Sequence, residues 1–341
     1  MRRADRRAGG ESASSARRRA SLAAVSLVFA TATGCSGASS APSVHAQPTP
    51  AKATPATRTP RGRTSGPPAP LLVAPTAATA TASAPSPHSG ALYWIVGGTT
   101  LNQLRATDAE GTVTTRFFDT PHAYLMSNYG SIPRGWTSTP TASFTSYATM
   151  QRAVTDGTLD PHARAVLYDN ERWWLTPAGE QADPARYYQL AATLAHRHSL
   201  LLVATPGVSL AAGSPGQDRY SAFLASGLIG SIARVADAID LQAQGTETNL
   251  AAYRAFVVAA AAQARQSNPA VVVLAGISTS SDSRGVDAAT LVTAIRSVRS
   301  SVDGFWLNDP ARSQYCPTCV GPFPQVALSV LATLARDPGI G

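Results

Sequence analysis

Seven short apolar runs, separated by stretches long enough to form helices, dominate the chain from residue 91 onward. Runs that are apolar throughout fit strands buried on both faces, as the strands of a parallel sheet are. We expect strands at LYWIV (92–96), HAYLMS (122–127), AVLYD (165–169), LLLVA (200–204), AIDLQAQ (238–244), VVVLAGI (271–277) and VDGFWLN (302–308), with TRFFD (115–119) as an eighth.

The stretches between these runs carry helix-end signals. Asp183 followed by Pro184 predicts the N-cap and first turn of a helix over ARYYQLAATLAHRH, and Asp287 predicts the cap of AATLVTAIRSVRS. We expect His196 and His198 at the surface, in the last turn of the first of these helices.

Alternation of strand and helix across residues 91–341 is typical of a β/α barrel or of a doubly wound sheet. A dinucleotide-binding sheet would carry G-x-G-x-x-G after its first strand, where this chain reads GGTT. The pattern therefore favours a (β/α)8 barrel of the TIM type.

The first 35 residues have the composition of an export signal. Seven arginines in residues 1–20 precede SLAAVSLVFATATG (21–34), a run of signal-core length that is too short to span a membrane as a mature helix. The segment ATGC, ending at Cys35, resembles the lipobox of bacterial lipoproteins, which implies cleavage before Cys35 and lipid attachment to its thiol. RRRASL (17–22) resembles a twin-arginine signal, so the Sec and twin-arginine routes both stay open.

Residues 36–90 consist largely of Ala, Pro, Ser and Thr. Such a segment buries too little apolar surface to offset the entropy of ordering, so we expect a disordered tether. The chain thus divides into an export signal (1–35), a tether (36–90) and a barrel domain (91–341).

The excess of positive over negative charge lies within residues 1–64, in the signal and the start of the tether. Residues 1–64 hold 11 of the 28 basic residues and 2 of the 20 acidic ones, which leaves 17 against 18 in residues 65–341. A nucleic-acid-binding surface would need basic residues clustered on the folded part, so we expect no nucleic-acid partner. We expect an exported monomer, outside the cytoplasm, that is either lipid-anchored to the cell membrane or secreted, and that meets a membrane only through its lipid anchor.

Cys316 and Cys319 form the motif CPTC in a loop rich in Pro and Gly. An even pair in an exported chain favours a structural disulfide over a redox dithiol, which usually opens a helix. No His or Cys pair with zinc-ligand spacing accompanies them, so we expect no metal site, and no motif calls for a cofactor.

Three of the expected strands end in polar residues. Asp169 and Glu171 lie two residues apart at the end of the AVLYD run, with Tyr168 before them and Trp173 and Trp174 after. In a β/α barrel, catalytic groups project from the carboxyl ends of the strands.

The other two polar ends carry amides and further acids. In AIDLQAQ, a period of two puts the polar residues on one side and Ile239, Leu241 and Ala243 on the other. Carboxylates, amides and flat aromatic surfaces together suit a sugar ring. The candidate contacts on these two strands are Asp240, Gln242, Gln244, Trp306, Asn308 and Asp309.

LYDNE, with Trp306 on the last strand, resembles the family 18 chitinase-like glycoside hydrolases, whose motif ends Asp-x-Asp-x-Glu. The resemblance implies a barrel in which Glu171 is the general acid, Asp169 orients the substrate's acetamido group, and Trp306 floors the sugar site. Tyr168 and Trp173 join the expected substrate contacts.

The sequence also departs from this motif. The two upstream acids of the motif fall on Leu167 and Arg164, and the Tyr-Asp of the family's later strand is replaced by DLQAQ. A two-carboxylate mechanism therefore stays open, in which Glu171 works with an acid from another strand: Asp240, Glu247 or Asp309.

Each candidate has a structural alternative. Asp169 and Glu171 could pair with an arginine at a loop start, Trp173 and Trp174 could pack a loop on the rim, and Trp306 could belong to the core. His122 is a further candidate for acid–base work. We expect a cell-envelope glycoside hydrolase acting on a polysaccharide or cell-wall glycan; the alternative is a non-catalytic barrel that binds a glycan or another envelope component.

Overall fold

The computed structural model describes residues 91–126, 132–211, 213, 216–281, 284–314 and 316–338. These residues belong to the second of two compact units, Thr79–Gly341. The expected export signal, Cys35 and the tether lie outside the described residues and stay predictions.

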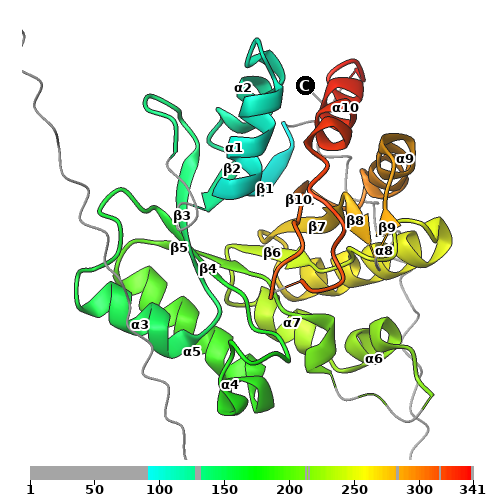
Figure 1. Ribbon diagram of the computed structural model, residues 1–341. Helices are drawn as coiled ribbons and strands as arrows, with labels where there is room; N and C mark the ends of the chain where they lie inside the picture. The colour runs from blue at the N-terminus through cyan, green and yellow to red at the C-terminus, as the bar shows by residue number, and fades with distance from the viewer. Residues whose placement is uncertain are drawn as a thin grey trace, which may run out of the picture. The chain divides into compact units, whose positions relative to one another are not determined.

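Eight parallel strands close into a barrel in the order β1-β10-β7-β6-β5-β4-β3-β2 (Figure 1). Neighbours in space follow the chain order except at the seam between β1 and β10, which is the arrangement of a (β/α)8 barrel. This confirms the fold class predicted from the sequence. The strands are β1 (Tyr93–Gly97), β2 (Ala123–Met126), β3 (Thr139–Phe144), β4 (Ala165–Tyr168), β5 (Leu201–Ala204), β6 (Ala238–Leu241), β7 (Val272–Ser278) and β10 (Gly304–Asn308).

Helices surround the ring of strands (Figure 1). A short antiparallel pair, β8 (Ser280–Ser281) and β9 (Arg284–Gly285), follows β7 outside the barrel. The helices are α1 (Gly98–Thr107), α2 (Thr112–Phe118), α3 (Tyr147–Thr155), α4 (Ala178–Ala182), α5 (Pro184–Arg197), α6 (Arg219–Ala225), α7 (Leu228–Ala233), α8 (Leu250–Ser267), α9 (Ala288–Val298) and α10 (Pro324–Leu334), with a 3-10 turn, η2 (Val208–Leu210).

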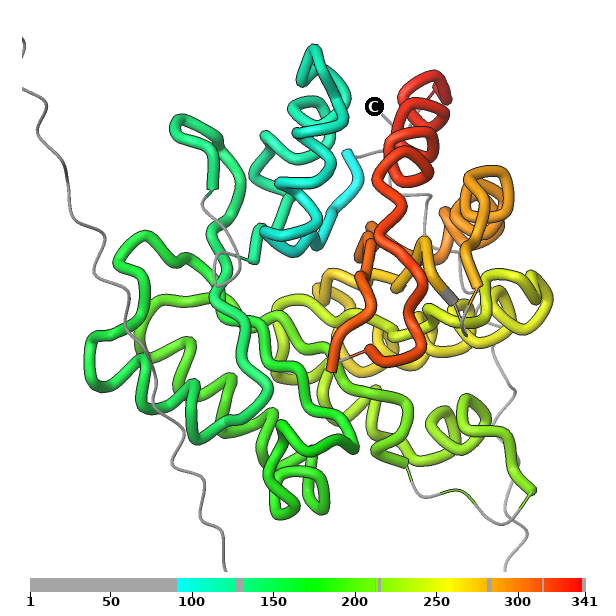
Figure 2. Tube along the Cα trace, in the orientation of Figure 1, coloured from blue at the N-terminus to red at the C-terminus, as the bar shows by residue number. Residues whose placement is uncertain are grey.

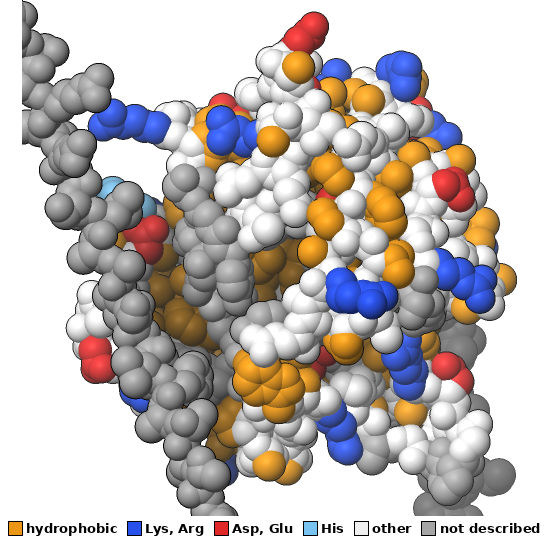
Figure 3. Space-filling model, viewed as in Figure 1, with side chains coloured by type: hydrophobic (Ala, Val, Ile, Leu, Met, Phe, Trp, Pro, Cys, Tyr) orange, Lys and Arg blue, Asp and Glu red, His pale blue; other side chains and the backbone are white. Residues whose placement is uncertain are grey.

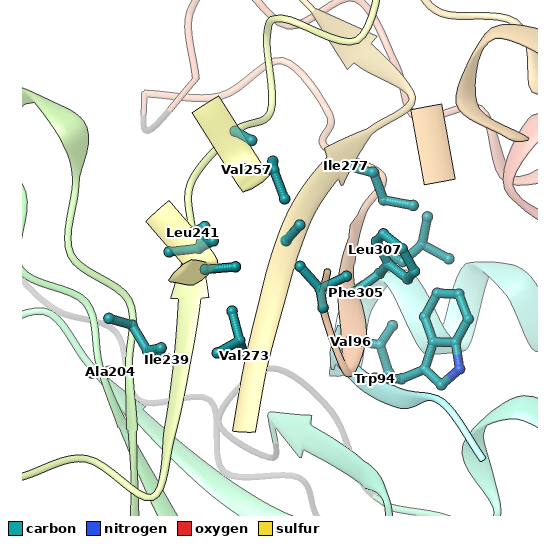
Figure 4. Packing of buried hydrophobic residues seen from close by; sticks show 14 of the residues in the cluster. Trp94, Val96, Ala204, Ile239, Leu241, Val257, Val273, Ile277, Phe305 and Leu307 are labelled. Atoms are coloured by element: carbon teal, nitrogen blue, oxygen red, sulfur yellow. The ribbon is translucent and has the colours of Figure 1, made fainter. Parts of the chain in front are cut away.

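Side chains of each strand alternate between the inside of the barrel and the layer under the helices. Ala165 and Leu167 of β4 belong to the inner cluster, whereas Val166 and Tyr168 belong to the outer one. Figure 4 shows part of the outer layer, where Ile239 and Leu241 of β6 lie with residues of β7 and β10. This parity fixes which residues at the strand ends point into the barrel mouth.

The barrel closes where β1 runs beside β10, the first and last strands in the chain (Figure 2). Tyr93 pairs with Gly304 and Ile95 with Trp306. A Cβ on Gly304 would lie 1.9 Å from the Tyr93 carbonyl oxygen, so the seam requires glycine there.

The expected strand at 115–119 is wrong, because those residues lie in or directly after helix α2. Phe117 and Phe118 are buried edge-on against Trp94, so a helix face explains their apolar character. The eighth strand is β3, whose sequence TPTASF has only its two central residues buried. Its hydroxyl-bearing residues and Pro140 concealed it from a reading based on apolar runs.

Both predicted helix starts are confirmed. Asp183 accepts a hydrogen bond from the Arg186 N–H at the start of α5, and Asp287 accepts one from the Thr290 N–H at 2.9 Å at the start of α9. His196, in the last turn of α5, hydrogen-bonds Asp237 at 2.9 Å and is exposed, as is His198.

Cys316 and Cys319 form the expected disulfide, with their Cα atoms 5.4 Å apart. The bridge closes a small loop between β10 and α10. Cys319 is buried, so the bridge fixes this loop on the barrel.

On the face shown in Figure 3, the Lys and Arg side chains stand apart from one another among polar and apolar atoms. Among the described helices, none is both long enough and apolar enough to cross a membrane.

We predict that Gly304→Ala lowers the free energy of unfolding by roughly 3 kcal/mol or more, because the new methyl group would overlap backbone at the seam. Gly179→Ala is the matched control: its Cβ would meet the Tyr187 hydroxyl at an ordinary 3.8 Å, inside helix α4. The control should be neutral or slightly stabilising. Urea unfolding of both variants measures the difference, and equal midpoints would contradict this account of the seam.

Candidate active site

The end of β4 sets the direction of the two predicted acids. Asn170 lies between them and is held on the outer side, where its Nδ2 donates to the Tyr168 hydroxyl at 3.1 Å and to the Glu180 carbonyl at 3.0 Å. Because neighbouring residues point in opposite directions, Asp169 faces the barrel interior and Glu171 follows it at the rim.

The buried Glu180 holds this arrangement in place through several hydrogen bonds, from the outer side of the barrel. Its carboxylate accepts hydrogen bonds from the Tyr168 hydroxyl at 2.6 Å, from Ser146 Oγ at 3.1 Å and from the Tyr147 N–H at 2.7 Å. The contacts join the end of β4 to the start of α3. The prediction of Tyr168 as a substrate contact is corrected, because its side chain is fully buried in the outer layer and bonded to Glu180.

Gln242, at the end of β6, joins the two acids. Its Nε2 donates to Asp169 Oδ1 at 3.0 Å, to Glu171 Oε1 at 3.2 Å and to the Thr205 carbonyl at 3.0 Å. Three of the predicted site residues, from two separate strands, therefore meet in one network at the carboxyl rim of the barrel.

Burial governs the protonation of the pair. Asp169 is 9% exposed, and its desolvation raises its pKa well above the ordinary range, with the Glu171 charge raising it further. Desolvation also raises the pKa of Glu171, although hydrogen bonds with Gln242 and Asp169 oppose the shift. The pair thus keeps a proton at a pH where an exposed carboxyl would have lost it.

Two further residues shape the pair. Thr205, the first residue after β5, donates its hydroxyl to Asp169 Oδ1 at 3.0 Å. Gly207 leaves room for Glu171, since a Cβ there would lie 2.7 Å from Glu171 Cγ. The sequence analysis missed both residues, although a polar residue directly after the apolar run at 200–204 was a signal for Thr205.

Asp240 points into the barrel interior below this network. It is fully buried, and neither carboxylate oxygen has a hydrogen-bond partner among the described residues. Desolvation raises its pKa well above the ordinary range, and in its ionised form it would raise the pKa of Asp169. Asp240 is therefore a buried acid at the floor of the site, near Asp169, and its burial favours the protonated form.

Gln244 and Trp306 lie on the β7 and β10 side of the interior. A Cβ on Gly276 would come within 1.8 Å of Gln244 Oε1, so this glycine makes the space in which the amide lies. Trp306 pairs with Gly276 in the sheet and belongs to the inner cluster. Gln244 Oε1 and Trp306 Nε1 are both buried and have no hydrogen-bond partner among the residues that the structure describes, so the interior holds a donor and an acceptor that could serve a ligand.

The acids proposed from other strands serve structural contacts. Glu247 is buried and accepts the Ser278 N–H and the Gly245 N–H, each at 2.7 Å. Asp309 Oδ1 accepts the Thr279 hydroxyl at 2.5 Å and the Phe323 N–H at 2.6 Å, which ties the loop after β10 to α10. Asn308, at the end of β10, is half-buried.

The two tryptophans after Glu171 differ in exposure. Trp173 is half-buried, and its indole N–H donates to Thr176 Oγ1 at 2.8 Å, which fixes the ring against the loop after β4. Trp174 is 69% exposed. A fixed ring and an exposed ring therefore lie beside the pair of acids along the chain.

The ion-pair alternative for the two acids is not what the structure contains. In the described part of the chain the ion pairs join His196 to Asp237, Arg265 to Asp303 and Arg296 to Asp337. The Arg172 guanidinium instead donates to the Leu210 carbonyl at 3.4 Å. The acids of the pair thus hydrogen-bond to neutral side chains.

His122 lies away from this network. It directly precedes β2, at the amino rim of the barrel, where its ring contacts Tyr93 at a centroid distance of 4.5 Å. The prediction of His122 as an acid–base candidate is therefore corrected. Within the described ranges, no cluster of three or more His, Cys, Asp or Glu side chains could hold a metal ion.

No family model and no curated protein matches this chain. Solved structures with some likeness include triosephosphate isomerase from Bartonella henselae, with 12% identity, a TM-score of 0.41, and coverage of 72% of this chain and 99% of the other. A candidate α-L-fucosidase from Bacteroides thetaiotaomicron has 11% identity and a TM-score of 0.34, over 50% of this chain and 58% of the other. An active-site mutant of a Rhizomucor miehei β-1,3-glucanosyltransferase, in complex with laminaritriose, has 9% identity and a TM-score of 0.34, over 63% and 86%. At these TM-scores the likenesses carry no functional argument, and the fold assignment rests on the strand order.

We predict that Asp240→Asn changes how stability depends on pH. The raised pKa means that folded Asp240 keeps its proton while the unfolded chain loses one above about pH 4, so its contribution to stability falls as pH rises toward the folded-state pKa. The variant lacks this loss and should gain on the wild type by about 1.4 kcal/mol per pH unit in that window. Urea unfolding between pH 4 and pH 8 measures the difference, and parallel curves for the two proteins would refute a neutral buried Asp240.

Proposed function

We propose that the barrel hydrolyses an O-glycosidic bond in a polysaccharide or cell-wall glycan, with Glu171 as the general acid. The observation that carries the proposal is the buried carboxyl pair bridged by Gln242 at the carboxyl rim. A general acid must be protonated at the working pH, and burial raises the pKa of Glu171 in that direction.

Within this proposal, Asp169 acts through Glu171. Asp169 Oδ1 and Glu171 Oε1 accept hydrogen bonds from the same Gln242 Nε2, at 3.0 and 3.2 Å, so the two carboxyl groups lie side by side at one edge of the rim. Two carboxyls that flank a glycosidic bond stand about 5 to 10 Å apart, on opposite sides of it. We therefore assign Asp169 as a positioning residue, which helps to orient Glu171 through the shared Gln242.

The nucleophile of the reaction then comes from elsewhere. The closeness of Asp169 and Glu171 fits the mechanism that the family 18 resemblance implies. In that mechanism the substrate's own acetamido group attacks, and an aspartate orients this group. A glycan with N-acetylated sugars is the substrate class this reading favours. Trp306, at the floor of the barrel interior, and the rings of Trp173 and Trp174 supply flat surfaces for sugar rings.

A second candidate function is glycan binding without turnover. One observation favours it: Glu247 and Asp309, two of the three acids considered as a second carboxylate, are committed to backbone hydrogen bonds. A barrel mouth with Glu171, Gln242 and aromatic rings still offers what a sugar ligand needs.

Location follows from the amino-terminal segments. We propose that the protein is exported, cleaved before Cys35 and held to the membrane by lipid on that residue, with residues 36–90 as a tether that lets the barrel reach the envelope. The proposal includes a monomer with no nucleic-acid partner.

We predict that Glu171→Gln reduces hydrolysis of the preferred glycan by about 100- to 10,000-fold, because it removes the proton donor while keeping the shape. Glu110→Gln, at an exposed acid before α2, is the matched control and should keep full activity. Reducing-end release from chitin oligosaccharides, β-glucan and peptidoglycan measures turnover. Glycan binding without turnover in the wild type would favour the binding function; equal turnover in wild type and Glu171→Gln would exclude Glu171 as the acid.

We predict that Gln242→Leu moves the alkaline limb of the pH–activity profile to higher pH. The hydrogen bond from Gln242 lowers the pKa of Glu171, so its removal keeps Glu171 protonated further up the pH scale. Gln189→Leu, at an exposed glutamine on α5, is the control and should leave the limb in place. A limb that moves to lower pH in Gln242→Leu would contradict the role of Glu171 as the acid.

A further inference from the structure

A hollow with a volume of about 930 Å³ opens at the amino rim of the barrel, opposite the rim that carries Asp169 and Glu171. It lies between the turn before β3 and the turn before β4, at the amino ends of parallel strands, whereas Asp169, Glu171 and Gln242 follow carboxyl ends. Its size falls within the range of about 300 to 1,000 Å³ typical of small-molecule sites. Its polar and aromatic lining includes Arg134, Trp136, Ser138, Asp160, His162 and Arg164.

Both turns are fixed by hydrogen bonds. Asp119 Oδ1 accepts the Thr137 N–H at 2.6 Å and the Thr137 hydroxyl at 3.1 Å. On the other side, the Ala163 N–H donates to the Asp160 carbonyl at 2.9 Å, and the Arg164 N–H donates to the Pro140 carbonyl at 2.8 Å. The walls of the hollow therefore hold their shape without a ligand.

The charge of the lining favours an anion. Among the described residues of the lining, Arg134 and Arg164 are accompanied by one acid, Asp160, so the guanidinium groups outnumber the carboxylates. Asp160 Oδ1 also accepts the His162 N–H at 2.9 Å, which engages part of that carboxylate. Guanidinium groups bind carboxylate and phosphate in a bidentate manner.

Ser138 indicates that the ligand also carries hydrogen-bonding groups. Ser138 is one of the residues that line the hollow; it is 5% exposed, and its Oγ has no hydrogen-bond partner in the described part of the chain. A buried hydroxyl without a partner is costly unless a ligand or water satisfies it. Trp136 adds a half-buried aromatic ring, held under the Arg105 guanidinium at 5.7 Å from its centroid.

We propose that this hollow binds an acidic saccharide, with a uronic acid carboxylate on Arg134 and Arg164, a sugar ring against Trp136 and a hydroxyl on Ser138 Oγ. An inorganic anion would use the arginines but would leave the buried Ser138 hydroxyl without a partner. The chain enters the barrel at this same rim, with Tyr93 of β1. The site would hold an acidic polymer at the amino rim while the opposite rim stays open, and it does not depend on the proposed hydrolysis.

Calorimetric titration of the full-length protein with trigalacturonate tests the proposal, with the neutral trisaccharide maltotriose as the ligand control. We expect trigalacturonate to bind and maltotriose not to bind. The double variant Arg134→Gln/Arg164→Gln should weaken trigalacturonate binding at least about tenfold. Arg116→Gln/Arg152→Gln removes the same charge from exposed sites on α2 and α3, outside the hollow, and should keep wild-type affinity.

Ser138→Ala keeps the test decisive if the double variant folds poorly. It should weaken trigalacturonate binding several-fold without loss of thermal stability, because the residue it replaces has an unpaired buried hydroxyl. Equal binding of the two trisaccharides, an equal loss in the two double variants, or displacement of trigalacturonate by equimolar inorganic phosphate would overturn the assignment.

Discussion

Closure of the barrel between β1 and β10 is the constraint on which the site depends. An open sheet would leave the ends of β4 and β6 on a twisted edge, whereas a closed ring turns the carboxyl ends of all eight strands toward one mouth. At the seam the backbones come so close that residue 304 has no space for a side chain. The position of Glu171 relative to Gln242 is thus set partly by a glycine on the far side of the ring.

Within that ring, two opposing effects determine the protonation of Asp169 and Glu171. Burial favours the protonated forms of Asp169 and Glu171, and hydrogen bonds from Thr205 and Gln242 favour the ionised form of Asp169. Because Gln242 is neutral, it holds the two acids together without removing their proton. An arginine in the same place would lower the pKa of both acids and favour their ionised forms. Asp240, which lies below the pair, is another acid and does not offset the charge of the pair. The result is a barrel mouth lined by acids whose burial favours their protonated forms.

Strand positions and helix starts were readable from the sequence because each depends on local pattern. The strand 139–144 could not be predicted in this way, because its Thr, Pro and Ser residues form no apolar run. Its pairing with β2 and β4 depends on the backbone alone. For the site, a period of two correctly put Asp240 and Gln242 on one side. It also put Tyr168 opposite Asp169, yet Tyr168 was expected at the substrate. Glu180 accepts a hydrogen bond from Tyr168, 12 residues away in the chain, and Gly207 leaves space for Glu171, 36 residues away. No local sequence pattern predicts such contacts.

The shared hydrogen bonds of Asp169 and Glu171 with Gln242 narrow the possible reactions more than the identity of either residue does. Two acids held side by side on one amide approach a sugar ring from the same side, so they do not flank the bond from opposite faces. A hydrolase built on such a pair needs its nucleophile from the substrate or from an ordered water, because Glu247 and Asp309 hold backbone and Asp240 is sealed beneath the pair. A binding protein needs neither. What separates the two functions is therefore whether the bound glycan, or a water ordered beside it, supplies a group that can attack the anomeric carbon.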